Sequence, residues 1–183
     1  MNNIPKIVVN EYLTIEPFQP SDKEALIRYL NDAELYANTL KVPSPYTESD
    51  ADSWLAATEA QREAPGGVSD WSIRHCDFGL IGGIGAFVKT GMEGHLDEIG
   101  YWLGAPFRGQ GIMTEVVKRF TEWLFETRPA LVRIEAGVHT HNPASARVLE
   151  KAGFQKEGIA RKLHFKNGAY IDAIQMAKIR GSY

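Results

Sequence analysis

A glycine-rich stretch at residues 107–113, Phe-Arg-Gly-Gln-Gly-Ile-Met, restricts the fold of this chain more than any other segment. The residues before it, Leu96 to Leu103, look extended. After it, apolar residues recur at three- and four-residue steps, which is typical of an amphipathic helix. These residues are Met113, Val116, Val117, Phe120 and Leu124. The glycines therefore mark a strand-to-helix turn. There the first helical N–H groups lack intrahelical acceptors, and the positive end of the helix dipole lies at the same place.

A turn of this kind can bind phosphate, because glycine lets a ligand approach the backbone closely and Arg108 adds a positive charge. The predicted pyrophosphate cradle consists of Arg108, Gly109, Gln110, Gly111, Ile112 and Met113. Many α/β proteins use glycine at such a turn without binding phosphate, so the motif alone leaves both interpretations open. A P-loop is excluded, since the chain has no Gly-x4-Gly-Lys-Ser/Thr run, and the dinucleotide fingerprint fails at Thr114.

The length of 183 residues predicts one domain over residues 1–183. The net charge is −3 and no block of lysine or arginine occurs, which argues against a nucleic-acid partner. The chain has no apolar run of about 20 residues, so we expect no membrane partner. The lone cysteine, Cys76, excludes an internal disulfide and favours a cytoplasmic location.

The order of predicted elements gives an α+β class. Residues 1–10 read as a lead-in, and strands are predicted at residues 12–18, 68–75, 80–89, 96–103, 131–138, 154–165 and 169–179. Helices are predicted at residues 21–30, 32–38 and 47–63, with Ala64–Gly67 ending the third. A long helix follows Gly111. The last helix is capped by Asn142 and ended by Gly153, and an Asn-Gly pair at 167–168 predicts a tight hairpin.

Several segments resemble the GNAT superfamily of N-acetyltransferases. Arg108-x-x-Gly111-x-Met113 is similar to the Arg/Gln-x-x-Gly-x-Gly/Ala signature, although Met113 stands where that signature has Gly or Ala. The segment from Asn142 to Phe154 resembles the Asn-x-x-Ser…Glu-Lys-x-Gly-Phe element of the ribosomal-protein N-terminal acetyltransferase (Rim-type) branch. Residues 99–103 and 43–47 also resemble that branch, and the element order agrees over nearly the whole chain.

The resemblance implies a GNAT fold: a mixed, mostly antiparallel seven-strand sheet with helices on both faces, split between strands 4 and 5 (residues 96–103 and 131–138). Acetyl-CoA would lie in the split, with the backbone of Tyr101, Trp102 and Leu103 along its pantetheine arm. The resemblance also implies that Asn142 bonds the arm and that Ser145 donates to the departing thiolate.

The implied reaction is direct attack of a primary amine on acetyl-CoA in a ternary complex. A protein N-terminal α-amine is the favoured acceptor, and a small-molecule amine is the alternative. The enzyme would be a monomer or a homodimer.

Acetyl transfer needs a base, because an alkyl ammonium with a pKa of about 10 cannot attack before it loses a proton. Glu98 is the first candidate and His164 the second. Asp97 lies on the opposite face of the strand from Glu98, so only one of these carboxylates can face the substrate. The Leu103 N–H, or a neighbouring one, could stabilise the oxyanion.

His139 and His141 would share one face of a strand, which raises the question of a metal site. No third ligand stands at a recognisable spacing, so we predict no metal. Trp71, Phe87 and His139 could line an acceptor pocket or pack in the core.

Two other classes remain as alternatives. A nicotinamide-dependent oxidoreductase could use the same strand–turn–helix, with Glu135 as a weak match for the acidic ribose-binding residue. A non-catalytic acyl-CoA-binding module would release no thiol, so substitution of Glu98 or His164 would change nothing.

Overall fold

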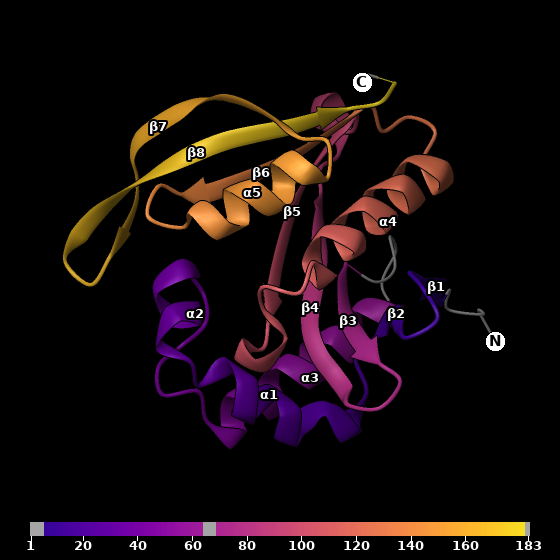
Figure 1. Cartoon of the computed structure of the whole chain (residues 1–183), viewed down its shortest axis with the longest axis vertical. Coiled ribbons are helices and arrows are strands. Elements are labelled where there is room, and N and C mark those ends of the chain that lie inside the picture. The colour runs from indigo at the N-terminus through magenta and orange to yellow at the C-terminus, as the bar shows by residue number, and fades with distance from the viewer. Residues whose placement is uncertain (1–5, 64–68, 182–183) are drawn as a thin grey trace. The chain divides into compact units, whose positions relative to one another are not determined.

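The protein was studied as a computed structural model, which describes residues 6–63 and 69–181. The helices are α1 Lys23–Leu30, α2 Ala33–Asn38, α3 Glu48–Glu63, α4 Ile112–Thr127 and α5 Pro143–Lys151 (Figure 1). The strands are β1 Ile7–Val8, β2 Leu13–Pro17, β3 Asp70–His75, β4 Gly79–Val88, β5 Leu96–Leu103, β6 Arg133–His139, β7 Gln155–Lys166 and β8 Ala169–Ile179. Short 3-10 helices form at η1 Pro20–Asp22, η2 Gly91–Glu93 and η3 Ala105–Phe107. The helix stop predicted at Ala64–Gly67 and the strand start predicted at Val68 lie outside the described residues.

The chain divides into two compact units. The first comprises Met1–Gly85 with Tyr101–Ile112, and the second comprises Ala86–Gly100 with Met113–Tyr183. In the first unit, β1 pairs antiparallel with β2, β2 with β3, and β3 with β4. Its helices pack over a buried cluster of Phe18, Leu26, Leu30, Leu35, Tyr46, Ala51 and Leu80. In the same unit the buried Asp22 accepts two hydrogen bonds from Arg74, at 2.7 and 2.6 Å.

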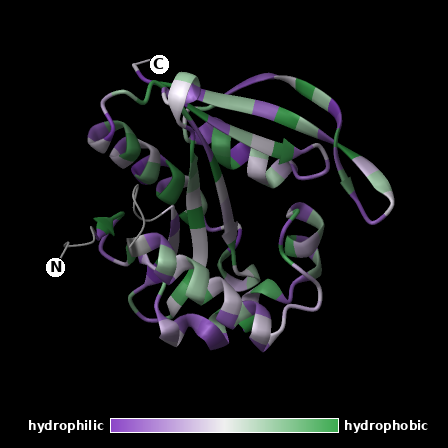
Figure 2. Cartoon of the chain, turned by 180° about the vertical axis from the view of Figure 1, so that it is seen from behind, coloured by the Kyte–Doolittle hydropathy of each residue, from purple (hydrophilic) through white to green (hydrophobic). Residues whose placement is uncertain are grey.

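In the second unit, β6 and β7 both pair antiparallel with β8. The β7–β8 hairpin turns at Asn167 and Gly168, whose φ angles of 52° and 78° suit a two-residue hairpin turn. Hydrophobic and hydrophilic residues alternate along α4 (Figure 2). Its buried positions include the predicted stripe of Met113, Val116, Val117, Phe120 and Leu124.

The sheet has the strand order β1-β2-β3-β4-β5-β6-β8-β7, which makes it eight-stranded rather than seven-stranded as predicted. The additional strand is β1, because Ile7 pairs with Ile15 and Val8 with Thr14 in what was predicted to be a lead-in. Two residues are too few to show an alternating pattern, so only pairing to β2 reveals this strand. The α+β class and the mixed, mostly antiparallel sheet are confirmed.

The split in the sheet lies at its parallel pair. Strand β5 is parallel to β6 through Leu96↔Arg133, Asp97↔Ile134 and Glu98↔Glu135. Within the described ranges this register ends at Glu98, although β6 continues to His139 against β8. Ile99 and Gly100, the next residues of β5 in the same unit, have no partner on β6 in this register.

No helix within residues 6–63 and 69–181 combines the length and the apolar character needed to cross a membrane.

Candidate active site

The turn before α4 depends on glycine for its backbone conformation. Gly109 and Gly111 have φ angles of +76° and +83°, in the left-handed region that other residues rarely adopt. A Cβ added at either position would meet no atom within 4 Å. Both glycines therefore face open space, and their requirement comes from φ rather than from close packing.

The backbone N–H groups of this turn have no protein acceptor. Across residues 6–63 and 69–181, no group accepts a hydrogen bond from the N–H of Gly109, Gln110, Gly111 or Ile112. The N-terminus of α4 adds the positive end of a helix dipole. Free N–H groups and that dipole together suit an anion. Met113 is 6% exposed, so its side chain is committed to the core and only its backbone could serve a ligand.

The side chains of Arg108 and Gln110 are bound by the protein itself. Gln110 donates from Nε2 to the Pro106 carbonyl at 2.9 Å. Arg108 donates from Nε to the Leu103 carbonyl at 3.0 Å and forms ion pairs with Asp32 and Glu34, each at 3.0 Å. The positive charge expected to face the phosphates is thus held against two carboxylates of the α2 segment.

At the end of β5, the side chain of Trp102 packs inside the first unit. The Trp102 ring lies over Gly83 of β4, since a Cβ at Gly83 would stand 2.5 Å from its Nε1 atom. Trp102 also packs against the buried cluster of the first unit. Its side chain is therefore a packing element, and the predicted cofactor role rests on the backbone of residues 101–103.

The two candidate carboxylates on β5 differ sharply in their surroundings. Asp97 is fully buried, bonds to the Arg128 guanidinium and accepts from the Lys89 N–H at 3.4 Å. Glu98 is half-buried, and its carboxylate makes no hydrogen bond or ion pair among the described residues. Asp97 is thereby committed to structure, whereas Glu98 remains available for proton transfer.

The start of α5 has the predicted cap. Asn142 accepts at Oδ1 from the Ser145 N–H at 3.1 Å, and Pro143 occupies the first helical position. The amide NH2 of Asn142 is not used by this cap and can donate elsewhere. Gly153 ends the helix region with a φ of +93°.

A cluster of three histidines was not foreseen from sequence. The ring centroid of the buried His139 lies 5.2 Å from that of His141 and 5.3 Å from that of His164. His164 reaches this position because β7 and β6 both pair with β8. Sequence spacing carries no signal for a contact made through an intervening strand.

Convergent donor atoms identify a different group of possible metal ligands. In the described chain, one group of three such residues has its donor atoms within 4.8 Å of one another, namely His75, Cys76 and Asp77. They are adjacent in sequence at the β3–β4 turn, where Cys76 and Asp77 are exposed. The three histidines of the cluster do not converge this closely. Of the predicted acceptor-pocket residues, Trp71 is buried and Phe87 is 47% exposed.

A mixed sheet with the parallel pair β5–β6, and a glycine turn with open amides after β5, form the arrangement that the sequence resemblance to N-acetyltransferases predicts. Residues 12–155 match the acetyltransferase (GNAT) domain family, and the chain belongs to this family. It is therefore an acetyl-CoA-dependent N-acetyltransferase, and the oxidoreductase alternative is wrong.

Three relatives of this chain are named for different activities. The probable N-acetyltransferase YjcK of Bacillus subtilis (strain 168) is 53% identical over 74 residues, which are 40% of each chain. The putative ribosomal N-acetyltransferase YdaF of the same organism is 27% identical over 94% of this chain and 93% of its own. The L-amino acid N-acetyltransferase AaaT of Escherichia coli (strain K12) is 27% identical over 92% of this chain and 98% of its own.

Among solved structures, the ribosomal-protein-S5-alanine acetyltransferase of Vibrio fischeri superposes with a TM-score of 0.83 at 25% identity. The match covers 97% of both chains.

Proposed function

We propose that the enzyme acetylates the N-terminal α-amine of a protein. The observation that carries this proposal is the similarity to YdaF, a putative ribosomal N-acetyltransferase, over 94% of this chain. The structural likeness to a ribosomal-protein-S5-alanine acetyltransferase over 97% of both chains supports it.

The amides from Gly109 to Met113 hold the diphosphate of acetyl-CoA. This assignment is supported by the open N–H groups at the start of α4 and by the two left-handed glycines. The backbone of Tyr101, Trp102 and Leu103 bonds the pantetheine arm, as an additional strand would. The Leu103 carbonyl already accepts from Arg108, so the backbone group of Leu103 that we assign to the arm or to the oxyanion is its N–H.

Glu98 is the base that takes the proton from the acceptor ammonium. Its side chain is half-buried, and its carboxylate makes no hydrogen bond or ion pair in the described part of the chain. Glu98 is also the last residue of β5 that is paired with β6. His164 is the second candidate, since imidazole is a common general base in enzymes. A base in this role contributes about 10²–10⁴-fold to the rate. Ser145 then donates a hydrogen bond to the departing thiolate, and Asn142 bonds the arm.

A small-molecule acceptor is the second candidate function. It is favoured by the similarity to the L-amino acid N-acetyltransferase AaaT, which has the same identity of 27% and covers 92% of this chain. An amino acid carries the same α-amine as a protein N-terminus, so one site chemistry serves both. The two acceptors differ in whether the site must also admit a polypeptide chain.

The test follows thiol release from acetyl-CoA with a coloured disulfide reagent. Acceptors are Ala- and Ser-initiated decapeptides, the same peptides with a blocked N-terminus, free amino acids, spermidine and an aminoglycoside. We expect turnover with the free-amine peptides and none with the blocked ones. Higher kcat/KM for free amino acids than for every peptide would overturn the protein-acceptor proposal. Complete absence of thiol release, with acetyl-CoA still bound, would indicate the non-catalytic module.

The base is tested with the Glu98→Gln and His164→Gln variants. We expect Glu98→Gln to lower kcat by at least about 100-fold, while the Kd of acetyl-CoA stays unchanged. If His164→Gln shows this loss and Glu98→Gln does not, the two roles are exchanged.

A further inference from the structure

The Arg108 side chain connects three parts of the first unit. Its Nε donates to the Leu103 carbonyl at the end of β5, and its two terminal nitrogens bond Glu34 and Asp32 at 3.0 Å. Its own backbone leads directly into Gly109. One side chain therefore joins the end of β5, the start of α2 and the glycine turn. Guanidinium–carboxylate bonds of this kind are directional and stronger than neutral hydrogen bonds.

Asp32 carries two functions in this contact. It is the N-cap of α2 and accepts from the Leu35 N–H at 2.6 Å through Oδ1, the same atom that bonds Arg108. Burial raises the pKa of the Asp32 carboxyl, but hydrogen bonds from the Leu35 N–H and from Arg108 outweigh this effect, so the pKa lies below its ordinary value. The carboxylate is therefore ionised at neutral pH. In that form it caps α2 and at the same time pairs with Arg108.

The charges of this contact argue against a phosphate role for the Arg108 side chain. One guanidinium faces two carboxylates, and three of its five N–H donors are engaged. The side chains of Arg108 and Asp32 are only 28% and 24% exposed. Moving Arg108 to a diphosphate would leave both carboxylates unpaired next to a second anion.

We propose that Arg108 is a positioning residue, which fixes α2 and the end of β5 against the glycine turn and leaves binding of the diphosphate to backbone amides. The inference deepens the proposed function, because it rests on the cradle at Gly109–Met113. With Arg108 in place, α2 forms a fixed wall beside that cradle. Without it, α2 and the turn vary in position and the coenzyme must order them on binding.

The test compares Arg108→Gln with the double variant Asp32→Asn/Glu34→Gln. Asparagine also caps helices well, so Asp32→Asn removes the charge and keeps the cap. We expect both variants to raise the KM for acetyl-CoA about tenfold with little change in kcat, as loss of uniform binding does. The triple variant should raise the KM no further than Arg108→Gln or the double variant does, because all three residues act in one contact. Amide hydrogen exchange within α2 should rise in both variants.

Changes of opposite sign in the KM for acetyl-CoA in these two variants would overturn the inference. A side chain that binds phosphate would be released by Asp32→Asn/Glu34→Gln, so this variant would lower the KM while Arg108→Gln raised it. Unchanged KM in both would overturn it as well. Asp52→Asn is the matched control, because it removes the ion pair of Lys23 with Asp52 (2.9 Å) elsewhere in the same unit and should leave KM unaltered. If Gly111→Ala does not weaken CoA binding, the cradle itself fails, and this outcome is separate from failure of the Arg108 contact.

Discussion

Replacing Gly111 by alanine tests the cradle directly. Gly111 has a φ of +83°, and a Cβ there would meet nothing within 4 Å, so the substitution introduces backbone strain without a clash. A left-handed conformation costs a non-glycine residue about 1–2 kcal/mol. The turn can escape this cost by changing φ, which turns the N–H groups of residues 111 and 112 away from a common point.

Binding must then restore the strained turn, so the strain energy appears in the affinity. A cost of about 1–2 kcal/mol corresponds to a 5- to 30-fold rise in the Kd of CoA. Isothermal titration of CoA into the free enzyme measures this change. The free energy of unfolding, from urea denaturation, reports any share of the cost that stays in the folded protein.

Two other glycines provide matched controls. Gly79 also has a left-handed φ, +67°, with nothing within 4 Å, but it lies at the start of β4, next to the β3–β4 turn. Gly79→Ala should lower the free energy of unfolding by about 1–2 kcal/mol and leave the Kd unchanged. Gly158 has open surroundings and no left-handed φ, so Gly158→Ala should change neither quantity. Retention of CoA affinity by Gly111→Ala, or an equal loss in Gly79→Ala, would refute the reasoning.

Three further predictions concern the second unit. Asp97→Asn leaves the Arg128 guanidinium without its buried partner, so urea denaturation should show a loss of about 1.5–3 kcal/mol in unfolding free energy, whereas Glu98→Gln should show almost none. Ser145→Ala removes the hydroxyl but keeps the backbone N–H that completes the cap of α5, so kcat should fall about tenfold or more while the cap is retained. The hydrogen bond with Arg133 lowers the pKa of the Glu157 carboxyl below its ordinary 4.5, so its stabilisation is present above that value and is lost as pH falls. Chemical denaturation between about pH 5 and pH 3 should therefore show a smaller loss of stability in Glu157→Gln than in the parent protein.

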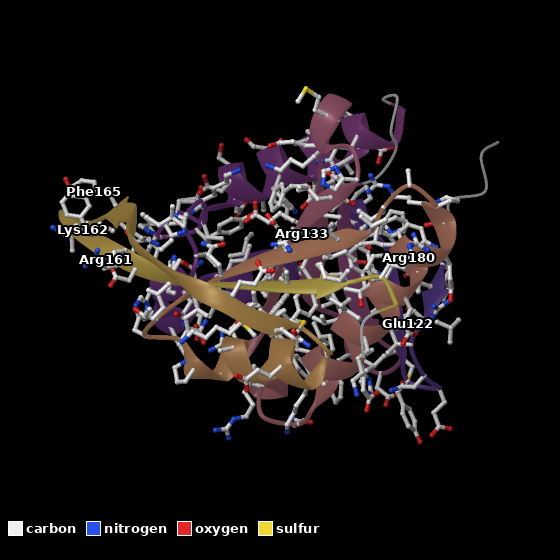
Figure 3. The ribbon with its side chains drawn as sticks, turned by 90° about the horizontal axis from the view of Figure 1, so that it is seen from above. Glu122, Arg133, Arg161, Lys162, Phe165 and Arg180 are labelled. Atoms are coloured by element: carbon white, nitrogen blue, oxygen red, sulfur yellow. The ribbon has the colours of Figure 1, made fainter. Side chains whose placement is uncertain are left out.

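The far end of the β7–β8 hairpin depends on contacts that are not part of the proposed chemistry. Figure 3 shows Arg161, Lys162 and Phe165 together at this end, with Arg133 nearer the middle of the unit. The Phe165 ring lies 5.0 Å from that of Tyr170, and the Lys162 ammonium lies 5.5 Å from the Tyr170 ring centroid. Cross-strand pairs of this kind stabilise a hairpin that extends beyond the core.

The sequence by itself determined the features that short segments encode. The period of Met113, Val116 and Phe120 specified α4 and its buried face. The Asn142 cap and the Gly153 stop fixed α5 to the residue, because capping and left-handed turns need only a few neighbouring residues. The turn at Gly109 and Gly111, whose φ angles are left-handed, was located for the same reason. β1 escaped prediction because a two-residue strand exists only through its partner.

The tertiary structure decided which side chains are free to act. Asp97 and Glu98 are adjacent and chemically alike, yet only the position of Arg128 commits Asp97 to structure and leaves Glu98 available. Arg108 is separated from Asp32 by more than seventy residues, so no local pattern indicates that its charge is already compensated. His164 meets His139 only because β8 lies between their strands. Side-chain pairing depends on which distant segments fold together, and that information is distributed over the whole chain rather than held in any one motif.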